Sequence, residues 1–167
     1  MKNLLFCRKG ILFLGIIGAT LMQSCAVLKS PEVTHHGSMK NYKYVYINQT
    51  HEKSSVHGGT YRGGYGYTAS KTISPGEIIS SHFIKRGYVV VNNIKEENLD
   101  KTMIVNYSES GRRQISLFSY TIEITIQITS AKSDEVICIG VAEGQGETES
   151  DDIRVAINRC MEAIFQK

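Results

Sequence analysis

The residues most able to do chemistry lie near the carboxyl end, where acids and glycines alternate in the segment GQGETES at 144–150. Its spacing approaches the G-x-G-x-x-G loop that holds a pyrophosphate between a strand and a helix. Glu149 occupies the third glycine position, however, and the surrounding acids would repel phosphate while complementing a helix dipole. The same acids lack the spacing of a calcium loop. We therefore expect a helix N-terminus and predict neither a cofactor nor a metal ion.

A second candidate is the pair Arg112 and Arg113 in the segment ESGRR, whose composition predicts an exposed turn. Two adjacent guanidinium groups could bind the carboxylate of a ligand, although such a turn could equally serve solubility alone. We predict no catalytic residues, because the chain has neither a G-x-S-x-G nor an S-x-x-K motif. His82 falls on a predicted helix, where a half-buried histidine is ordinarily structural.

Two cysteines of the predicted domain, Cys138 and Cys160, could form a disulfide in an oxidising compartment. The bulkier residues Ile137, Ile139 and Val141 alternate with Cys138, which predicts that Cys138 points away from the core. Cys160 falls in the apolar stripe of the last helix, which packs on the core. We therefore expect the two thiols on opposite sides of the sheet and unpaired, unless a bulge reverses the faces.

Glycine and tyrosine dominate the segment at 48–73, for which we expect a flexible loop or a loose hairpin. Tyrosine offers amphipathic contact area at a low cost in conformational entropy. The segment therefore carries a candidate contact surface, and a passive mobile loop is the alternative. The tyrosines of this surface are Tyr61, Tyr65 and Tyr67.

The first 24 residues have the layout of a secretory signal peptide. Three cations open it, namely Lys2, Arg8 and Lys9. The apolar core at 11–22 is shorter than the roughly 20 residues that a membrane-spanning helix needs. A small residue, Ser24, comes directly before Cys25, and we predict cleavage between these two residues.

The pentapeptide LMQSC at 21–25 resembles the lipobox of bacterial lipoproteins. It departs from the usual pattern in having Met22 where leucine is usual, and Gln23 is more polar than is typical. The resemblance implies that Cys25 receives a diacylglyceryl group and becomes the first residue of the mature protein. Its acyl chains would anchor the domain in a membrane, and we expect the outer membrane with the domain facing the periplasm. The alternative is an ordinary cleaved signal in which Cys25 has no role.

Removal of the signal changes the charge of the protein. The whole chain carries 19 Lys and Arg against 16 Asp and Glu, and the signal removes three cations and no acids. The mature domain is therefore neutral and lacks an electrostatic footprint for nucleic acid. Residues 25–41 are polar and without hydrophobic periodicity, which predicts a lipidated N-terminus followed by a flexible tether. Residues 42–167 then form a single domain.

Hydrophobic periodicity orders this domain as β-α-β-β-β-β-α. A capping box beginning at Ser74 opens the first helix, and Gly87 ends it. Isoleucines alternate strictly with polar residues near the end of the longest strand, which predicts one buried and one solvent-facing side. The fold class is therefore α+β, a mixed and mostly antiparallel sheet with two helices on one face. The strands are expected at 42–47, 88–91, 102–107, 117–129 and 136–142, and the last helix at 151–165.

This order begins with PGEIISSHFIKRGYVVV and ends with YTIEITIQITSAKSDEVICIGVAEGQG and DDIRVAINRCMEAIF. It is similar to small envelope lipoproteins of Bacteroidetes and, more distantly, to the domain shared by the curli secretion lipoprotein, the TolB N-terminal region and the lipoprotein activators of penicillin-binding proteins. The resemblance implies a non-enzymatic protein-binding or assembly module, whose partners are other envelope proteins or further copies of itself. The contact surface would be the polar face of the long strand or the tyrosine-rich segment. The alternative is a periplasmic hydrolase or a small-ligand-binding lipoprotein.

Overall fold

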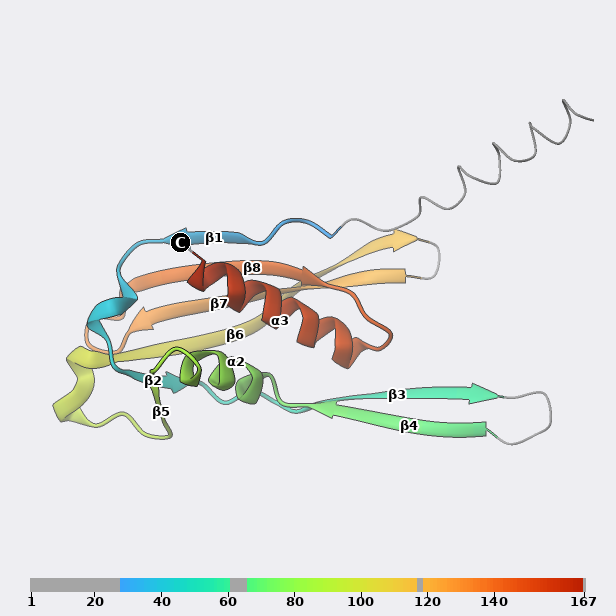
Figure 1. Cartoon of the computed structure of the whole chain (residues 1–167), viewed down its shortest axis with the longest axis horizontal. Helices are drawn as coiled ribbons and strands as arrows, with labels where there is room; N and C mark the ends of the chain where they lie inside the picture. The colour runs from blue at the N-terminus through green and yellow to red at the C-terminus, as the bar shows by residue number, and fades with distance from the viewer. Residues whose placement is uncertain (1–27, 61–65, 117–118, 167) are drawn as a thin grey trace, which may run out of the picture.

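The computed structural model describes residues 28–60, 66–116 and 119–166. Six strands form one sheet in the order β1-β8-β7-β6-β2-β5. They are β1 (Glu32–His35), β2 (Tyr44–Ile47), β5 (Val89–Val91), β6 (Thr102–Ser116), β7 (Ser119–Ser130) and β8 (Val136–Gly144). Strand β2 runs parallel to β5 and β6, and the other pairs are antiparallel. With helices α2 (Pro75–Ile84) and α3 (Glu149–Phe165), the structure confirms the predicted α+β class (Figure 1).

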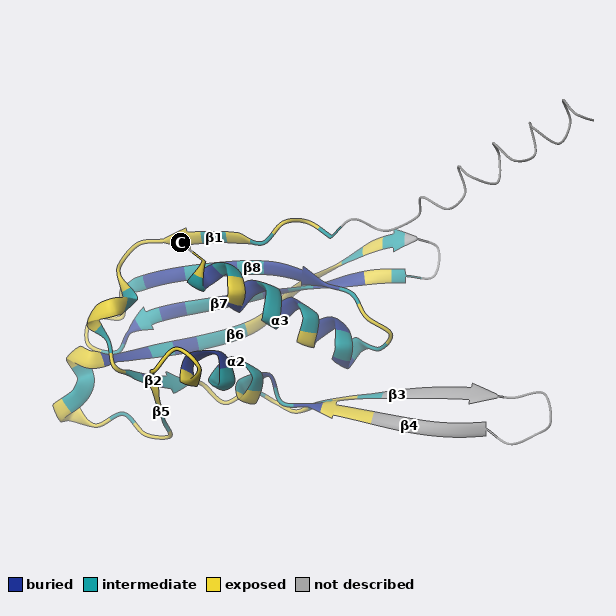
Figure 2. Cartoon of the chain, in the orientation of Figure 1, coloured by how far each residue is buried: buried dark blue, intermediate teal, exposed yellow. Residues whose placement is uncertain are grey.

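The core lies between β6, β7 and β8 and the two helices. The alternating isoleucines of β7 are fully buried, as predicted, and so are Ile153 and Ile157 of α3. Figure 2 shows the buried residues gathered on the central strands and on the sheet-facing side of α3. Each such isoleucine contributes about 1.5–3 kcal/mol by leaving water. No helix among the described residues has both the length and the apolar character needed to cross a membrane.

Strand β8 places its small residues, not its bulky ones, against α3. Cys138, Gly140 and Ala142 are buried on the helix side. A Cβ atom on Gly140 would lie 2.7 Å from the Sγ of Cys160, so α3 packs almost directly on the strand backbone. The prediction that Cys138 and Cys160 lie on opposite sides of the sheet is therefore wrong. The close approach of the helix requires small residues on the face that it covers.

Strand β6 continues through the predicted turn at ESGRR. Its register with β7 shifts between Glu109 and Gly111 and again between Gln114 and Ser116, and Ser116 lies opposite Ser119. Ser110 is left without a partner on β7, so this segment, whose polar composition predicted a turn, forms a bulge within the strand. The placement of Arg112 and Arg113 in a turn is therefore wrong, because both lie within the strand.

The amino-terminal segment also differs from the expected flexible tether. Residues 32–35 form β1, which pairs antiparallel with 138–141 of β8. A short 3-10 helix, η2 (Met39–Asn41), then connects β1 to β2. A second one, η3 (Glu96–Lys101), precedes β6. The polar strand β1 has no hydrophobic alternation, and its place at the sheet edge depends on distant residues of β8.

Most of the Gly/Tyr-rich segment is a two-stranded hairpin, β3 (Lys53–Thr60) and β4 (Gly66–Ile73). The hairpin projects beyond the main sheet (Figure 1). Its base is attached to the start of α3, where the hydroxyl of Ser150 donates to the carbonyl of Lys71 at 2.9 Å and accepts from Ser55 at 2.8 Å. An ion pair between Lys71 and Asp151 supports the same junction.

Helix α2 begins at Pro75 and is followed by Gly87 with a φ of 85°, as the sequence predicts. The capping box is not formed, because the side chain of Ser74 makes no cap hydrogen bond. Instead, the backbone N–H of Gly76 donates to the hydroxyl of Thr50 at 2.9 Å. A residue from the segment after β2 therefore caps this helix.

Candidate functional site

The two arginines that sequence reasoning grouped together point to different faces of the sheet. Arg112 lies opposite Ile122 of the buried face, and its Nη2 is 2.7 Å from a carboxylate oxygen of Glu149 at the start of α3. Its guanidinium also lies 5.3 Å from the ring centroid of Tyr120. Because adjacent residues of a strand face opposite sides, Arg113 turns to the other face. The two side chains therefore do not converge on one ligand.

Arg113 forms a two-point ion pair with Glu143 near the end of β8. Its Nε donates to Oε1 at 2.8 Å and its Nη2 to Oε2 at 2.6 Å. The Glu143 side chain is only 2% exposed. Hydrogen bonding from Arg113 holds the pKa of this carboxyl at about 2, further helped by the backbone N–H of Lys29. Glu143 is thus a buried anion balanced by the chain itself, and sequence reasoning missed it.

The structure describes little of the three proposed contact tyrosines. Tyr61 and Tyr65 lie outside the described residues, and Tyr67 is described only as the backbone partner of Gly59 in the hairpin. The surface that they would form stays a prediction.

The two thiols of the domain are free and buried. Burial raises the pKa of Cys138 to about 11 and that of Cys160 to about 12, and the proximity of Cys138 adds to the latter. Because the thiolate is the nucleophile, these values argue against catalytic cysteines. His82 is also buried, and its Nε2 lies 2.9 Å from Oδ1 of Asn158. That contact joins α2 to α3, as expected of a structural histidine.

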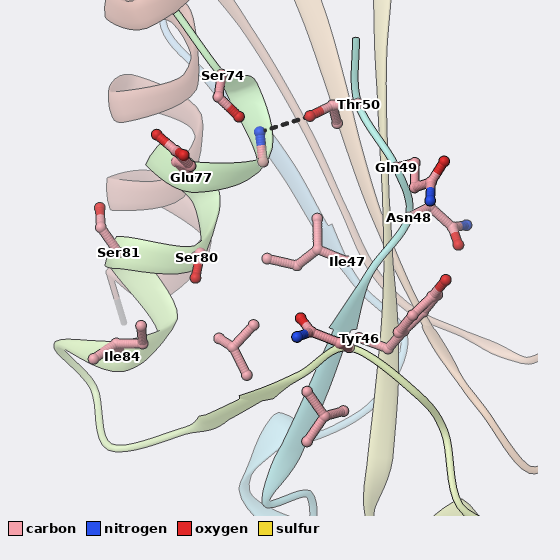
Figure 3. A pocket seen from close by; sticks show the side chains of 14 residues that line it. Tyr46, Ile47, Asn48, Gln49, Thr50, Ser74, Glu77, Ser80, Ser81 and Ile84 are labelled. Atoms are coloured by element: carbon pink, nitrogen blue, oxygen red, sulfur yellow. Dashed lines mark hydrogen bonds between the residues drawn. The ribbon is translucent and has the colours of Figure 1, made fainter. Parts of the chain in front are cut away.

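An open cavity of about 580 Å³ lies between α2 and the strands β2 and β5. Figure 3 shows Ser74, Glu77, Ser80, Ser81 and Ile84 on its helix side and Tyr46 to Thr50 on the other. Glu77 is its only carboxylate, and no His, Cys, Lys or Arg lines it. The hydroxyl of Ser81 donates to the carbonyl of Ile78 at 2.7 Å. The cavity therefore pairs no nucleophile with a base.

A second cavity, of about 640 Å³, lies between η2 and the end of α3, and its lining is more apolar. Across the described parts of the chain, no three His, Cys, Asp or Glu side chains gather as a metal site. No buried side-chain polar atom of those residues lacks a hydrogen-bond partner. Neither cavity therefore offers an unpartnered buried group for a ligand.

The sheet face opposite the helices has no helical cover. Helix α3 covers the isoleucine side of β7, and α2, which contacts α3, lies on the same side of the sheet beside β2 and β5. On that side the polar residues of β7 pair with apolar residues of β8, for example Thr125 with Val141 and Gln127 with Ile139. All four side chains are half-buried. This open sheet face mixes aliphatic area with hydrogen-bonding groups, as interfaces between proteins do.

No protein-family model matches the chain, and no curated protein matches it. Some solved structures are similar. A PelC dodecamer from Paraburkholderia phytofirmans has a TM-score of 0.46 at 12% identity, covering 81% of this chain and 96% of that chain. In another crystal form the PelC dodecamer has a TM-score of 0.42 at 11% identity, covering 80% and 94%.

A PDZ domain protein from Parabacteroides distasonis has a TM-score of 0.46 at 13% identity. The match covers 84% of this chain, which spans only 36% of that protein. TM-scores below 0.5 at this level of sequence identity do not indicate a shared function. The resemblance to envelope lipoproteins stays a prediction.

Proposed function

We propose that the chain is a membrane-anchored envelope lipoprotein, held by lipid on Cys25, whose domain is a non-enzymatic module for protein binding or assembly. The observation that carries the binding role is the open sheet face. Neither helix covers this face, and it combines half-buried aliphatic and polar side chains. The lipid anchor rests on the signal-like segment and on LMQSC at 21–25.

The side chains that could take part in catalysis favour an enzyme less than they favour a binding module. The arginines are engaged by the chain's own carboxylates, and burial raises the pKa of both thiols. The cavity beside α2 is the specific observation that favours a small-ligand-binding lipoprotein, because its size is adequate for a ligand. It lacks the convergent charged groups that a hydrolase would need.

Site-specific photo-crosslinking in cells tests the binding role. A photo-crosslinking amino acid in place of Gln127 is expected to give a discrete adduct, either a second copy of the chain or another envelope protein. The matched position is Glu162, which is exposed on α3 on the other side of the sheet. In the Ile139→Lys background the Gln127 adduct should disappear while the fold persists, because Ile139 lies directly opposite Gln127 on β8.

The outcome that contradicts the proposal is equal or absent crosslinking at both positions, or an adduct at Gln127 that Ile139→Lys does not affect. Deletion of residues 57–70 asks separately whether the hairpin contributes. A partner that co-purifies equally with and without those residues would remove the hairpin from the contact surface.

A further inference from the structure

The amino-terminal segment is fixed to the domain at Lys29. The backbone N–H of Lys29 donates to Oε2 of Glu143 at 3.1 Å, and its carbonyl accepts from Nη2 of Arg159 at 2.7 Å. Arg159 also donates to the backbone carbonyl of Glu143. The ammonium group of Lys29 lies 3.6 Å from Oε1 of the same carboxylate. We call these three residues the Lys29 clamp.

The clamp shortens the link to a lipid on Cys25. An extended chain covers at most about 3.6 Å per residue, so the four residues from Cys25 to Lys29 span no more than about 14 Å. That bound is shorter than the roughly 20 Å average reach of a flexible tether of 15 residues. A domain held this closely has a restricted set of orientations relative to the lipid surface.

Both hairpins project from the end of the molecule toward which the chain runs back from β1 to Leu28 (Figure 1). The opposite end carries η2, η3 and the turn between β7 and β8. Sequence composition distinguishes the two hairpins themselves. They have no acidic residue at 53–76 and no charged residue at 114–122, whereas the start of α3, which contacts the base of the β3–β4 hairpin, carries Glu149, Asp151 and Asp152. Tyr120, near the tip of the β6–β7 hairpin, is 37% exposed. Aromatic residues of this kind are enriched at membrane interfaces.

We infer that the end of the sheet carrying the two hairpins faces the lipid bilayer, in an orientation that the Lys29 clamp fixes. This inference rests on the proposed lipid anchor at Cys25. It names the bilayer as the partner of the hairpin end and leaves the open sheet face available to proteins.

The chain contains no tryptophan, so a single introduced tryptophan reports its own depth. One variant carries Tyr120→Trp at the hairpin end, and the matched variant carries Lys132→Trp in the exposed turn between β7 and β8. The protein from Cys25 to Lys167, the proposed mature form, is coupled through Cys25 to a maleimide lipid in phosphatidylcholine vesicles. Quenching by phospholipids brominated in their acyl chains is then measured. The other two thiols are buried and react poorly.

The inference predicts quenching at least threefold greater for Tyr120→Trp than for Lys132→Trp. Equal quenching, or greater quenching of Lys132→Trp, would overturn it. Adding Arg159→Gln frees the carbonyl of Lys29 while the ion pair of Glu143 with Arg113 stays intact, and the difference should then shrink toward equality. Both contacts of Lys29 with Glu143 remain in this variant, so an unchanged difference would refute the contribution of Arg159 to the clamp.

The coupled lipid supplies the anchor by chemistry, so this test works whether or not cells lipidate Cys25. A negative orientation result therefore leaves the proposed lipidation standing. Absence of lipid on Cys25 in cells would contradict the proposed function, but it would not affect the measurement on vesicles.

Discussion

Replacement of Glu143 by glutamine removes the buried charge at the centre of the Lys29 clamp. The carboxylate has a pKa of about 2 in the folded protein against an ordinary value of 4.5. A difference of 2.5 pKa units corresponds to about 3 kcal/mol. We discount this to about 2 kcal/mol, because Arg113 is 39% exposed and water screens part of the pair. Glu143→Gln should therefore lower the free energy of unfolding at pH 7 by about 2 kcal/mol.

The pH dependence of this loss follows from the direction of the shift. Because the folded pKa lies below the unfolded one, ionised Glu143 stabilises the fold fully above about pH 4.5. The stabilisation is lost progressively as the pH falls from there toward 2. Less than half of the difference between wild type and Glu143→Gln should remain at pH 3.

Urea unfolding of the protein from residue 25 to Lys167, with Cys25→Ser, measures both values at pH 7 and pH 3. The matched control is Glu123→Gln, which removes a carboxylate directly opposite Glu143 on β7. Glu123 accepts a hydrogen bond from Ser110 at 3.0 Å on the exposed surface, so its loss should cost about 0.5 kcal/mol or less. A Glu143→Gln effect no larger than the control, or one that is equal at both pH values, would refute the reasoning.

Two further predictions concern the packing of α3 on β8. A Cβ atom at Gly144 would lie 1.9 Å from the carbonyl oxygen of Asp152, so Gly144→Ala should cost about 3 kcal/mol or prevent folding. Gly37→Ala is the control, with its nearest contact at 3.7 Å, and urea unfolding should show a change within about 0.5 kcal/mol. In the protein from residue 25 to Lys167 with Cys25→Ser, Cys138 and Cys160 should resist Ellman's reagent at pH 8 and react fully in urea; rapid native reaction would contradict their burial.

The elements that sequence reasoning predicted well are those whose pattern is local. Alternation along β7 and the apolar stripe of α3 reflect burial of the same side chains in the structure. The end of α2 at Gly87 depends on a single residue in a left-handed conformation, with a φ of 85°. Each of these signals is complete within a few residues of the chain.

The errors arose where distant residues decide the outcome. Strand β1 is polar and short, and only its pairing with β8 makes it a strand. The bulkier side of β8 suggested the core, yet the close approach of α3 selects the side of Gly140. The composition of ESGRR fits a turn, whereas β6 continues through it with a bulge at Ser110.

One feature of the sequence pointed to the Lys29 clamp. Glu143 is the only charged residue in the strand VICIGVAEG, and a buried acid needs a cationic partner. Its partners come from β6 and from the segment before β1, at sequence distances of 30 and 114 residues. A single sequence does not identify contacts over such separations, so the site required the structure.

The most direct test of the central claim is metabolic labelling of cells with palmitate, comparing the wild type with Cys25→Ala. Label is expected to enter the wild-type protein and to be absent from Cys25→Ala, which should also keep its uncleaved signal. Absence of label from the wild type, or equal label in both proteins, would contradict the lipid anchor and with it the proposed function.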